Sequence, residues 1–280
     1  MMGRVAGWIR AALLREGSTR PAALMRVATM GMMWDLYASG MRLMDSLEPG
    51  RVLLGLNFWG STILFGVGLW TRWTGLWVGA TAMAIYFYGG YVLDIEPWTH
   101  HHNYMLQFCV LLLGLSPCGR SYSVDRWLEV RRAEREGRPP APERGPMWAI
   151  TLICWQVSLL YFWGAYNKSY YAFLIGSRME NYFMYYYTGS DRPDALWWKV
   201  FMVASGAGSI FFEYLLAFGL WVRRWQVWLI PAGILFHLGI YYTLPVSTFS
   251  LTMAVLYLAF LDPDRVHRFI DRISGVPSTV

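Results

Sequence analysis

The chain has 280 residues, of which 56% are hydrophobic, 18% aromatic and only 15% charged. A typical soluble domain is roughly one quarter charged, so this composition excludes an ordinary soluble fold and favours an integral membrane protein. The net charge of +6 does not indicate a nucleic-acid partner. The arginines lie between apolar segments, where membrane topology explains them.

The first 21 residues are predicted to form an interfacial amphipathic helix. Apolar side chains recur at helical spacing, opposite three arginines: Val5, Trp8, Ile9, Ala12 and Leu13, against Arg4, Arg10 and Arg15. This segment lacks the continuous apolar stretch of a cleaved signal peptide. It is therefore expected to lie in the membrane surface.

Eight later segments are apolar over roughly the length that crosses a bilayer at about 1.5 Å per residue. They are residues 22–40, 52–70, 73–93, 101–116, 147–167, 196–221, 226–244 and 246–261. The sequence predicts an all-α fold, a polytopic transmembrane helix bundle of about eight spans within residues 22–262. The turns at 71–72 and 222–225 are short, so the helices that they join should be antiparallel.

The two sides of this bundle differ in arginine content. With the N-terminus in the cytoplasm, 17 arginines lie on that side, and the other side has Arg42, Arg51, Arg178 and Arg192. Because cytoplasmic loops carry an excess of Lys and Arg, both termini are predicted to be cytoplasmic. Residues 263–280 then form a cytoplasmic tail.

Two polar segments separate the spans. A cytoplasmic linker covers about 117–146, and its part at 131–146 is charged and rich in proline, which predicts a flexible connection after the fourth span. The loop at 168–195 lies on the outer side and is dense in aromatic residues. Tyrosines suit the membrane interface, so simple anchoring accounts for that loop.

The three cysteines, Cys109, Cys118 and Cys154, lack the spacing of a zinc site or a disulfide framework. Buried apolar filler is their simplest interpretation. Three adjacent histidines, at 100–102, point about 100° apart on a helix, so they do not converge on one metal ion. No metal site is predicted, and one of these histidines is expected to face the bundle interior.

Lys168 is an exception in a chain that has 24 basic residues and only two lysines. It ends the fifth span, at a depth where a charged side chain is costly and burial favours the neutral amine. A neutral lysine can accept a proton, which arginine cannot. The alternative is an interfacial lysine whose ammonium group reaches water.

His237 lies near the middle of an apolar span, where it serves either a functional role or a hydrogen bond between helices. Arg26, Asp35 and Glu213 are further charges inside predicted spans. Pairing between helices is the preferred interpretation of these three.

Several sequence blocks together carry a family resemblance. HHHNYMLQF followed by RSYSVDRWL looks like the H-x-Y and R-Y-x-S-V-D elements of vitamin K-dependent gamma-carboxylases and their bacterial relatives, the horizontally transferred transmembrane domain proteins. YFWGAYNKSYY is similar to its Y-F-x-x-G-x-x-K segment, and FHLGIYYTLPVSTFS to a later F-H helix with a Phe-Ser element. The blocks occur in the expected order over most of residues 20–262.

The resemblance implies an enzyme that uses a reduced naphthoquinone with O2 and CO2 as co-substrates. Lys168 matches the base that deprotonates the quinol, and His102 matches the histidine of the H-x-Y element. The alkoxide formed from the quinol and O2 would abstract a weakly acidic proton before CO2 adds. The resemblance places the remaining candidate quinol-binding residues around it: His237, Asn167, Tyr104, Trp163 and Tyr161.

The implied location is the cell (plasma or inner) membrane, with the active site toward the extracytoplasmic side. The expected partners are the lipid bilayer, a membrane quinone and a secreted peptide or protein acceptor. The residues after Lys168, SYYAF, depart from the family's K-L-D-x-D-W continuation, which puts protein carboxylation in doubt. The alternatives are a non-catalytic quinone- or lipid-binding protein, a peptide-maturation partner and a structural scaffold.

Overall fold

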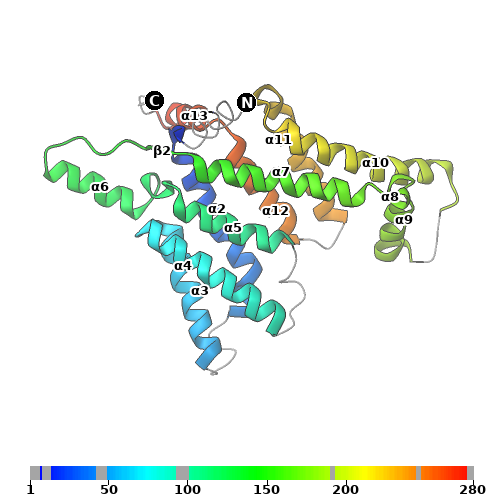
Figure 1. The fold of residues 1–280 in the computed structure, drawn as a ribbon, viewed down its shortest axis with the longest axis horizontal. Helices are drawn as coiled ribbons and strands as arrows, with labels where there is room; N and C mark the ends of the chain where they lie inside the picture. The colour runs from blue at the N-terminus through cyan, green and yellow to red at the C-terminus, as the bar shows by residue number, and fades with distance from the viewer. Residues whose placement is uncertain are drawn as a thin grey trace. The chain divides into compact units, whose positions relative to one another are not determined.

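The computed structural model describes residue 7 and residues 14–41, 49–92, 101–189, 193–243 and 247–275. Most of these residues are helical, which agrees with the predicted all-α class (Figure 1). The helical segments in the first half are α2 (Arg20–Tyr37), η1 (Ala38–Met41), α3 (Pro49–Val67), α4 (Thr71–Ala84), the π-helical η2 (Ile85–Val92), α5 (His101–Leu115), η4 (Cys118–Arg120) and α6 (Val124–Arg135). Those that follow are α7 (Trp148–Lys168), α8 (Tyr171–Leu174), α9 (Ser177–Phe183), the π-helical η5 (Met184–Thr188), α10 (Leu196–Gly219), α11 (Arg223–Thr243), α12 (Ser247–Leu256), η6 (Tyr257–Phe260) and α13 (Pro263–Ser274).

A helix lies over each of the eight segments that the sequence predicts as spans. Among the described residues, three helices are both long and apolar enough to cross a membrane: α3, α7 and α10. The protein is thus a helical protein with membrane-spanning capacity. The count of eight spans and the cytoplasmic placement of the termini stay predictions.

A short antiparallel ribbon joins two segments for which the sequence predicts other structure. Strand β1 (Glu16–Ser18) pairs with β2 (Arg144–Pro146), with Gly17 opposite Gly145. The N-terminal helix expected over 1–21 therefore does not extend through Glu16–Ser18, because the backbone there bonds to the linker. The rest of that prediction, residues 1–6 and 8–13, lies outside the described residues.

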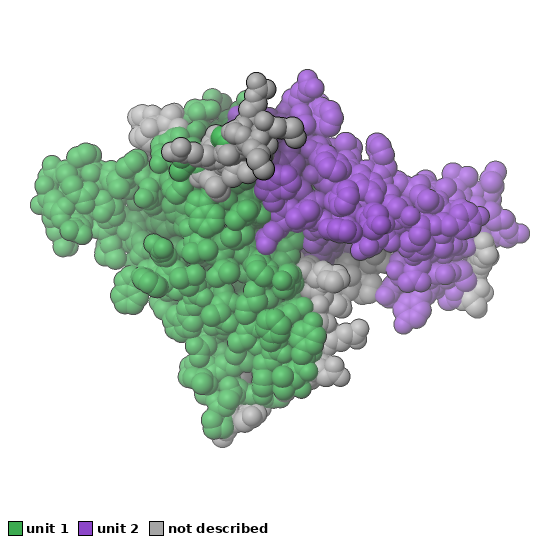
Figure 2. All heavy atoms as spheres, in the orientation of Figure 1, with its two compact units in different colours: residues 1–154, 255–280 green, residues 155–254 purple. Residues whose placement is uncertain are grey.

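The predicted linker is also more ordered than its composition suggests. Residues 131–135 continue helix α6, and residues 144–146 form β2. The chain divides into two compact units inside α7 rather than at this linker: unit 1 holds residues 1–154 and 255–280, and unit 2 holds residues 155–254 (Figure 2).

In unit 1, α4 packs against both α3 and α5. The α4–α5 crossing depends on two glycines, because a Cβ atom added to Gly75 would lie 2.4 Å from the Gly114 Cα atom. Small residues at such crossings let two helix backbones approach closely, which is how helices gain contact area inside a membrane.

The side chain of Arg26, on α2, is fully buried. Its guanidinium group donates to two carbonyl oxygens that follow α5, Cys118 O at 2.7 Å and Tyr122 O at 2.5 Å. Pairing between helices is the sequence prediction for this residue, and its observed hydrogen-bond acceptors are backbone carbonyl oxygens of η4 and of the segment before α6.

The polar face of helix α13 forms hydrogen bonds and ion pairs with the β1–β2 ribbon and with the first residue of α2. Arg20 donates to Asp271 at 2.5 Å, and Ser18 Oγ lies 2.8 Å from His267 Nδ1. Burial is the largest influence on His267 and lowers its pKa below the usual range. Arg144 adds a third link, to Asp264 at 2.9 Å.

Candidate functional site

The candidate site in unit 2 is built around Lys168, the last residue of α7. Its Nζ atom donates a hydrogen bond of 2.5 Å to Glu213 Oε1, from the C-terminal half of α10. The Glu213 side chain is only 8% exposed, whereas that of Lys168 is 33% exposed. One end of this ion pair is therefore enclosed by protein, and the other remains accessible from outside the unit.

The second carboxylate oxygen, Glu213 Oε2, is buried and has no hydrogen-bond partner among the described residues. It lies against Gly164, where an added Cβ atom would be 3.4 Å from Oε2. Gly164, which lies between Tyr161 and Lys168 in the sequence, thus leaves room for the carboxylate that pairs with Lys168. A buried carboxylate with only one bonded oxygen has remaining capacity to accept a hydrogen bond.

A second polar pair joins α7 to α11. Tyr161 Oη and His237 Nε2 lie 2.7 Å apart and share a hydrogen bond, and both side chains are almost fully buried. Two aromatic rings flank the imidazole, with centroid distances of 5.4 Å to Phe236 and 5.2 Å to Phe249. This packing fixes the orientation of the ring.

The two pairs lie on one face of α7. Tyr161 and Lys168 are seven residues apart, which is close to two helical turns, with about 10 Å of rise between them. Gly164 and the buried Ala165 lie between them on the same face. This face of α7 therefore carries a lysine that binds a carboxylate on α10 and a tyrosine that binds an imidazole on α11.

Two other predicted quinol-binding residues lie elsewhere on α7. Trp163 and Asn167 are exposed, and Trp163 packs edge-to-face on Tyr166 with centroids 5.3 Å apart. The structure does not bring them to the face that carries Lys168. The family resemblance implies a quinol-binding role for both, but residues adjacent on a helix point about 100° apart, so Asn167 does not share the direction of Lys168.

The remaining predicted residues belong to unit 1. Tyr104 on α5 is exposed and packs on Phe108, with ring centroids 4.5 Å apart. His102 lies in the first turn of α5, and its side chain is outside the described residues, as is the whole of His100. The association of His102 with Lys168 stays a prediction.

The RSYSVDRWL block performs a structural task in unit 1. Asp125 accepts hydrogen bonds from the backbone N–H groups of Trp70 and Thr71, both at 2.7 Å, and from the Thr71 hydroxyl at 2.6 Å. Ser123 caps α6 by accepting from the Arg126 N–H group at 2.8 Å. Asp125 therefore holds the turn between α3 and α4, and Ser123 holds the start of α6.

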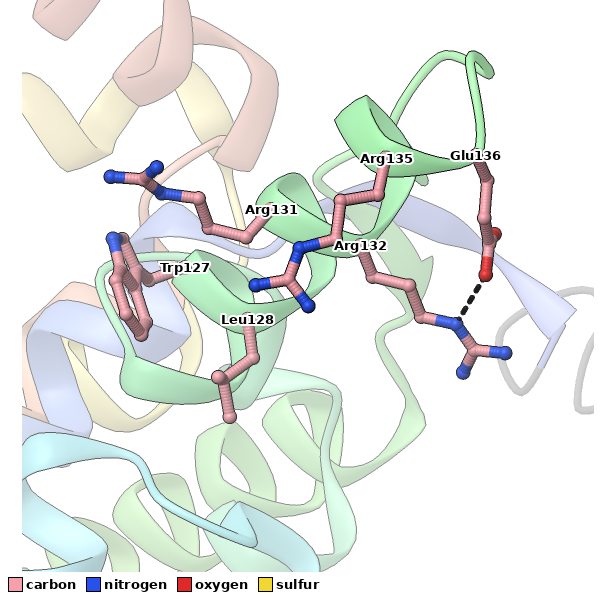
Figure 3. Close-up of a pocket in the computed structure, with 6 residues that line it drawn as sticks. All are labelled: Trp127, Leu128, Arg131, Arg132, Arg135 and Glu136. Atoms are coloured by element: carbon pink, nitrogen blue, oxygen red, sulfur yellow. Dashed lines mark hydrogen bonds and ion pairs between the residues drawn. The ribbon is translucent and has the colours of Figure 1, made fainter.

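A separate hollow of about 700 Å³ lies on α6 (Figure 3). Its lining residues are Trp127, Leu128, Arg131, Arg132, Arg135 and Glu136. Hydrogen bonding from Arg138 lowers the pKa of nearby Glu129 to about 2. None of the predicted quinol-binding residues lines this hollow.

Within the described ranges, no group of three or more His, Cys, Asp or Glu side chains is arranged to hold a metal ion. Cys109, Cys118 and Cys154 are buried free thiols. Of the two polar pairs of the candidate site, Glu213 is the member that the sequence did not assign to a site.

The family model of the HTTM domain matches residues 56–265, which is more than half of the chain. This match includes α7, α10 and α11, the helices that carry both polar pairs. No curated protein and no solved structure matches the chain.

Proposed function

The chain belongs to the HTTM-domain family, whose domain occurs in vitamin K-dependent gamma-carboxylase-like proteins, and on that premise we propose that it is a quinol-dependent membrane enzyme. In this proposal, the substrate is a reduced naphthoquinone that diffuses in the bilayer. Its reaction with O2 supplies a base strong enough to deprotonate an acceptor, to which CO2 then adds. The acceptor is a secreted peptide or protein.

The observation that carries this proposal is the ion pair of Lys168 with Glu213. A general base is a proton acceptor whose basicity suits the reaction, and a desolvated lysine can be such a base. Transfer of one proton from Nζ to Oε1 converts the ion pair into a neutral amine beside a neutral acid. The proposal requires that this neutral arrangement form beside a bound quinol.

Each residue then has a role that follows from its position. Lys168 accepts the proton of the quinol, because it is the more exposed partner of the pair. Glu213 orients the amine and holds the proton that the amine must lose first. Tyr161 and His237, which are buried and bonded to each other, position the quinol ring or its oxyanion through hydrogen bonding.

The family resemblance also assigns His102 to the quinol site. We propose that the site faces the extracytoplasmic side of the cell membrane, as the positions of Lys168 and His102 in the predicted topology imply. A non-catalytic quinone-binding protein remains the contrasting function, and it makes a different prediction for turnover.

The test measures naphthoquinol epoxidation by the purified protein in lipid nanodiscs. Lys168→Ala and Lys168→Arg should both reduce the rate by about 10²–10⁴-fold, which is the usual contribution of a general base. The arginine variant is informative because it keeps the positive charge opposite Glu213 but cannot release a proton at neutral pH.

Lys199→Ala is the matched control. Lys199 is the only other lysine and forms an exposed pair of 3.0 Å with Asp194 on the same unit, so its removal should leave the rate unchanged. Full activity in Lys168→Arg would show that only charge is needed, and the base assignment would fail. Quinone binding without any turnover in the wild type would favour the non-catalytic function.

A further inference from the structure

Helix α13 has three faces of different chemistry. At about 100° per residue, its apolar residues share one arc, and its acidic residues and histidine share another. The apolar arc holds Val266, Phe269, Ile270 and Ile273, the other holds Asp264, His267 and Asp271, and arginines 265, 268 and 272 separate the two on one side.

The buried arc is the polar one, which is unusual for an amphipathic helix in a protein. His267 and Asp271 are almost fully buried, whereas Phe269 is 61% and Ile273 is 68% exposed. A helix of a water-soluble protein normally buries its apolar stripe instead. The exposed arc of α13 therefore requires an apolar environment that the described part of unit 1 does not supply.

The orientation of α13 is fixed by contacts on three separate elements of unit 1. Arg20 of α2 binds Asp271, Ser18 of β1 binds His267, and Arg144 of β2 binds Asp264. In addition, Gly17 lets the ribbon approach the start of the helix, because an added Cβ atom would lie 2.7 Å from Pro263. Rotation of α13 to bury Phe269 would break all three links.

Both ends of α13 are formed by specific residues. Asp262 caps the first turn by accepting from the N–H groups of Asp264 and Arg265, both at 3.1 Å, and Pro263 occupies the first turn. Gly275 ends the helix with a φ of +66°. The apolar arc is thus presented by a rigid, capped helix.

We infer that α13 lies on a lipid surface, with its apolar arc in the acyl-chain boundary and its arginines on anionic headgroups. The helix begins at Pro263, three residues after the apolar segment Phe249–Phe260 ends. It therefore starts beside the bilayer if that segment is a span. Exposed Phe and Ile beside a row of arginines match the composition of interfacial helices that bind anionic membranes.

The inference is independent of the proposed enzymatic function. It adds to the expected cytoplasmic tail at 263–280 a helix over residues 263–274 that is bound to the membrane surface. A lipid surface is favoured over a second copy of this chain because the three arginines that flank the arc complement anionic phosphates.

Site-directed spin labelling tests the inference in the full-length protein. Cys109, Cys118 and Cys154 are buried, so an introduced surface cysteine can be labelled selectively. Labels are placed at Phe269→Cys and Ile273→Cys on the apolar arc. Matched controls are Arg268→Cys on the basic flank and Glu134→Cys on the exposed side of α6.

Collisions with O2, which concentrates in lipid, are compared with collisions with a water-soluble nickel chelate. In vesicles of phosphatidylcholine with phosphatidylglycerol, the O2-to-nickel ratio should be several-fold higher at 269 and 273 than at 268 and 134. Omission of phosphatidylglycerol should lower the ratio at 269 and 273.

Three results would overturn the inference. Equal ratios at all four positions would place the arc in water. Low collision rates with both reagents at 269 and 273 would mean that protein covers the arc. Dipolar broadening between labels at 273 would identify a second copy of the chain as the cover.

Discussion

Lys168 and Glu213 form the central contact at the scale of single residues. The Lys168 amine donates to the Glu213 carboxylate at 2.5 Å, so the position of the amine is set by a group on another helix. A partner that can itself take up the proton allows a lysine to be both well positioned and reactive.

Removal of one partner should destabilise the protein. Glu213→Ala leaves Lys168 without the carboxylate that it binds, and breaking a buried pair in this way typically costs 3–5 kcal/mol. Because the Lys168 side chain is 33% exposed, we expect a smaller loss, about 2–3 kcal/mol. Denaturant unfolding in mixed micelles, followed by tryptophan fluorescence, measures this change.

A double variant separates stability from chemistry. Lys168→Met with Glu213→Leu replaces the whole pair by apolar residues, which should restore stability to within about 1 kcal/mol of the wild type while activity stays lost. Lys199→Met, at an exposed pair, should change stability by less than about 1 kcal/mol. Retention of quinol turnover by the double variant would show that the pair serves folding alone.

Sequence patterns identified part of this site. Lys168 and His237 stand out because an ionisable residue is rare in an apolar helix. Glu213 stands out for the same reason, but its pairing with Lys168 depends on how α7 packs on α10, which a single sequence does not specify. The exposure of Trp163 and Asn167 follows from helical phase, and phase was available from the sequence.

At the scale of elements, glycine contacts determine how closely α4 and α5 pack. A Cβ atom added to Gly114 would lie 2.8 Å from backbone atoms of Gly75, so the helices must move apart to accommodate alanine. We expect Gly114→Ala to lower the free energy of unfolding by about 1–3 kcal/mol. Thermal unfolding in detergent, compared with the wild type, measures the effect.

Gly31→Ala is the control for that experiment. Gly31 also lies in a helix of unit 1, and a Cβ atom there meets nothing within 4 Å. Alanine is the better helix former, so this variant should be as stable as the wild type or slightly more stable. Equal destabilisation by both substitutions would contradict the close-packing account.

Hydrophobic length predicted the helices well, since a helix lies over every segment expected to span. The β1–β2 ribbon was not predictable, because its three-residue strands are paired across more than a hundred residues and carry no alternating pattern. The amphipathic pattern of α13 could be predicted from the sequence. The burial of its polar face, rather than its apolar face, could not be predicted, because it depends on Arg20 and Arg144, which are distant in sequence.

At the scale of the whole molecule, residues 56–265 form an HTTM domain, the domain found in vitamin K-dependent gamma-carboxylase-like proteins. Unit 2 carries the described polar pairs, and unit 1 carries the capped turns and α13. The proposed activity requires that a lipid-soluble quinol and O2 reach Lys168.

Oxygen-isotope labelling tests the central claim most directly. The purified wild-type protein is given reduced naphthoquinone under ¹⁸O₂, and the product is analysed by mass spectrometry. We predict a naphthoquinone epoxide that carries one ¹⁸O atom and that is lost in Lys168→Arg. The absence of labelled epoxide from the wild type, or its undiminished formation by Lys168→Arg, would contradict the claim that Lys168 is the base of a quinol-dependent reaction.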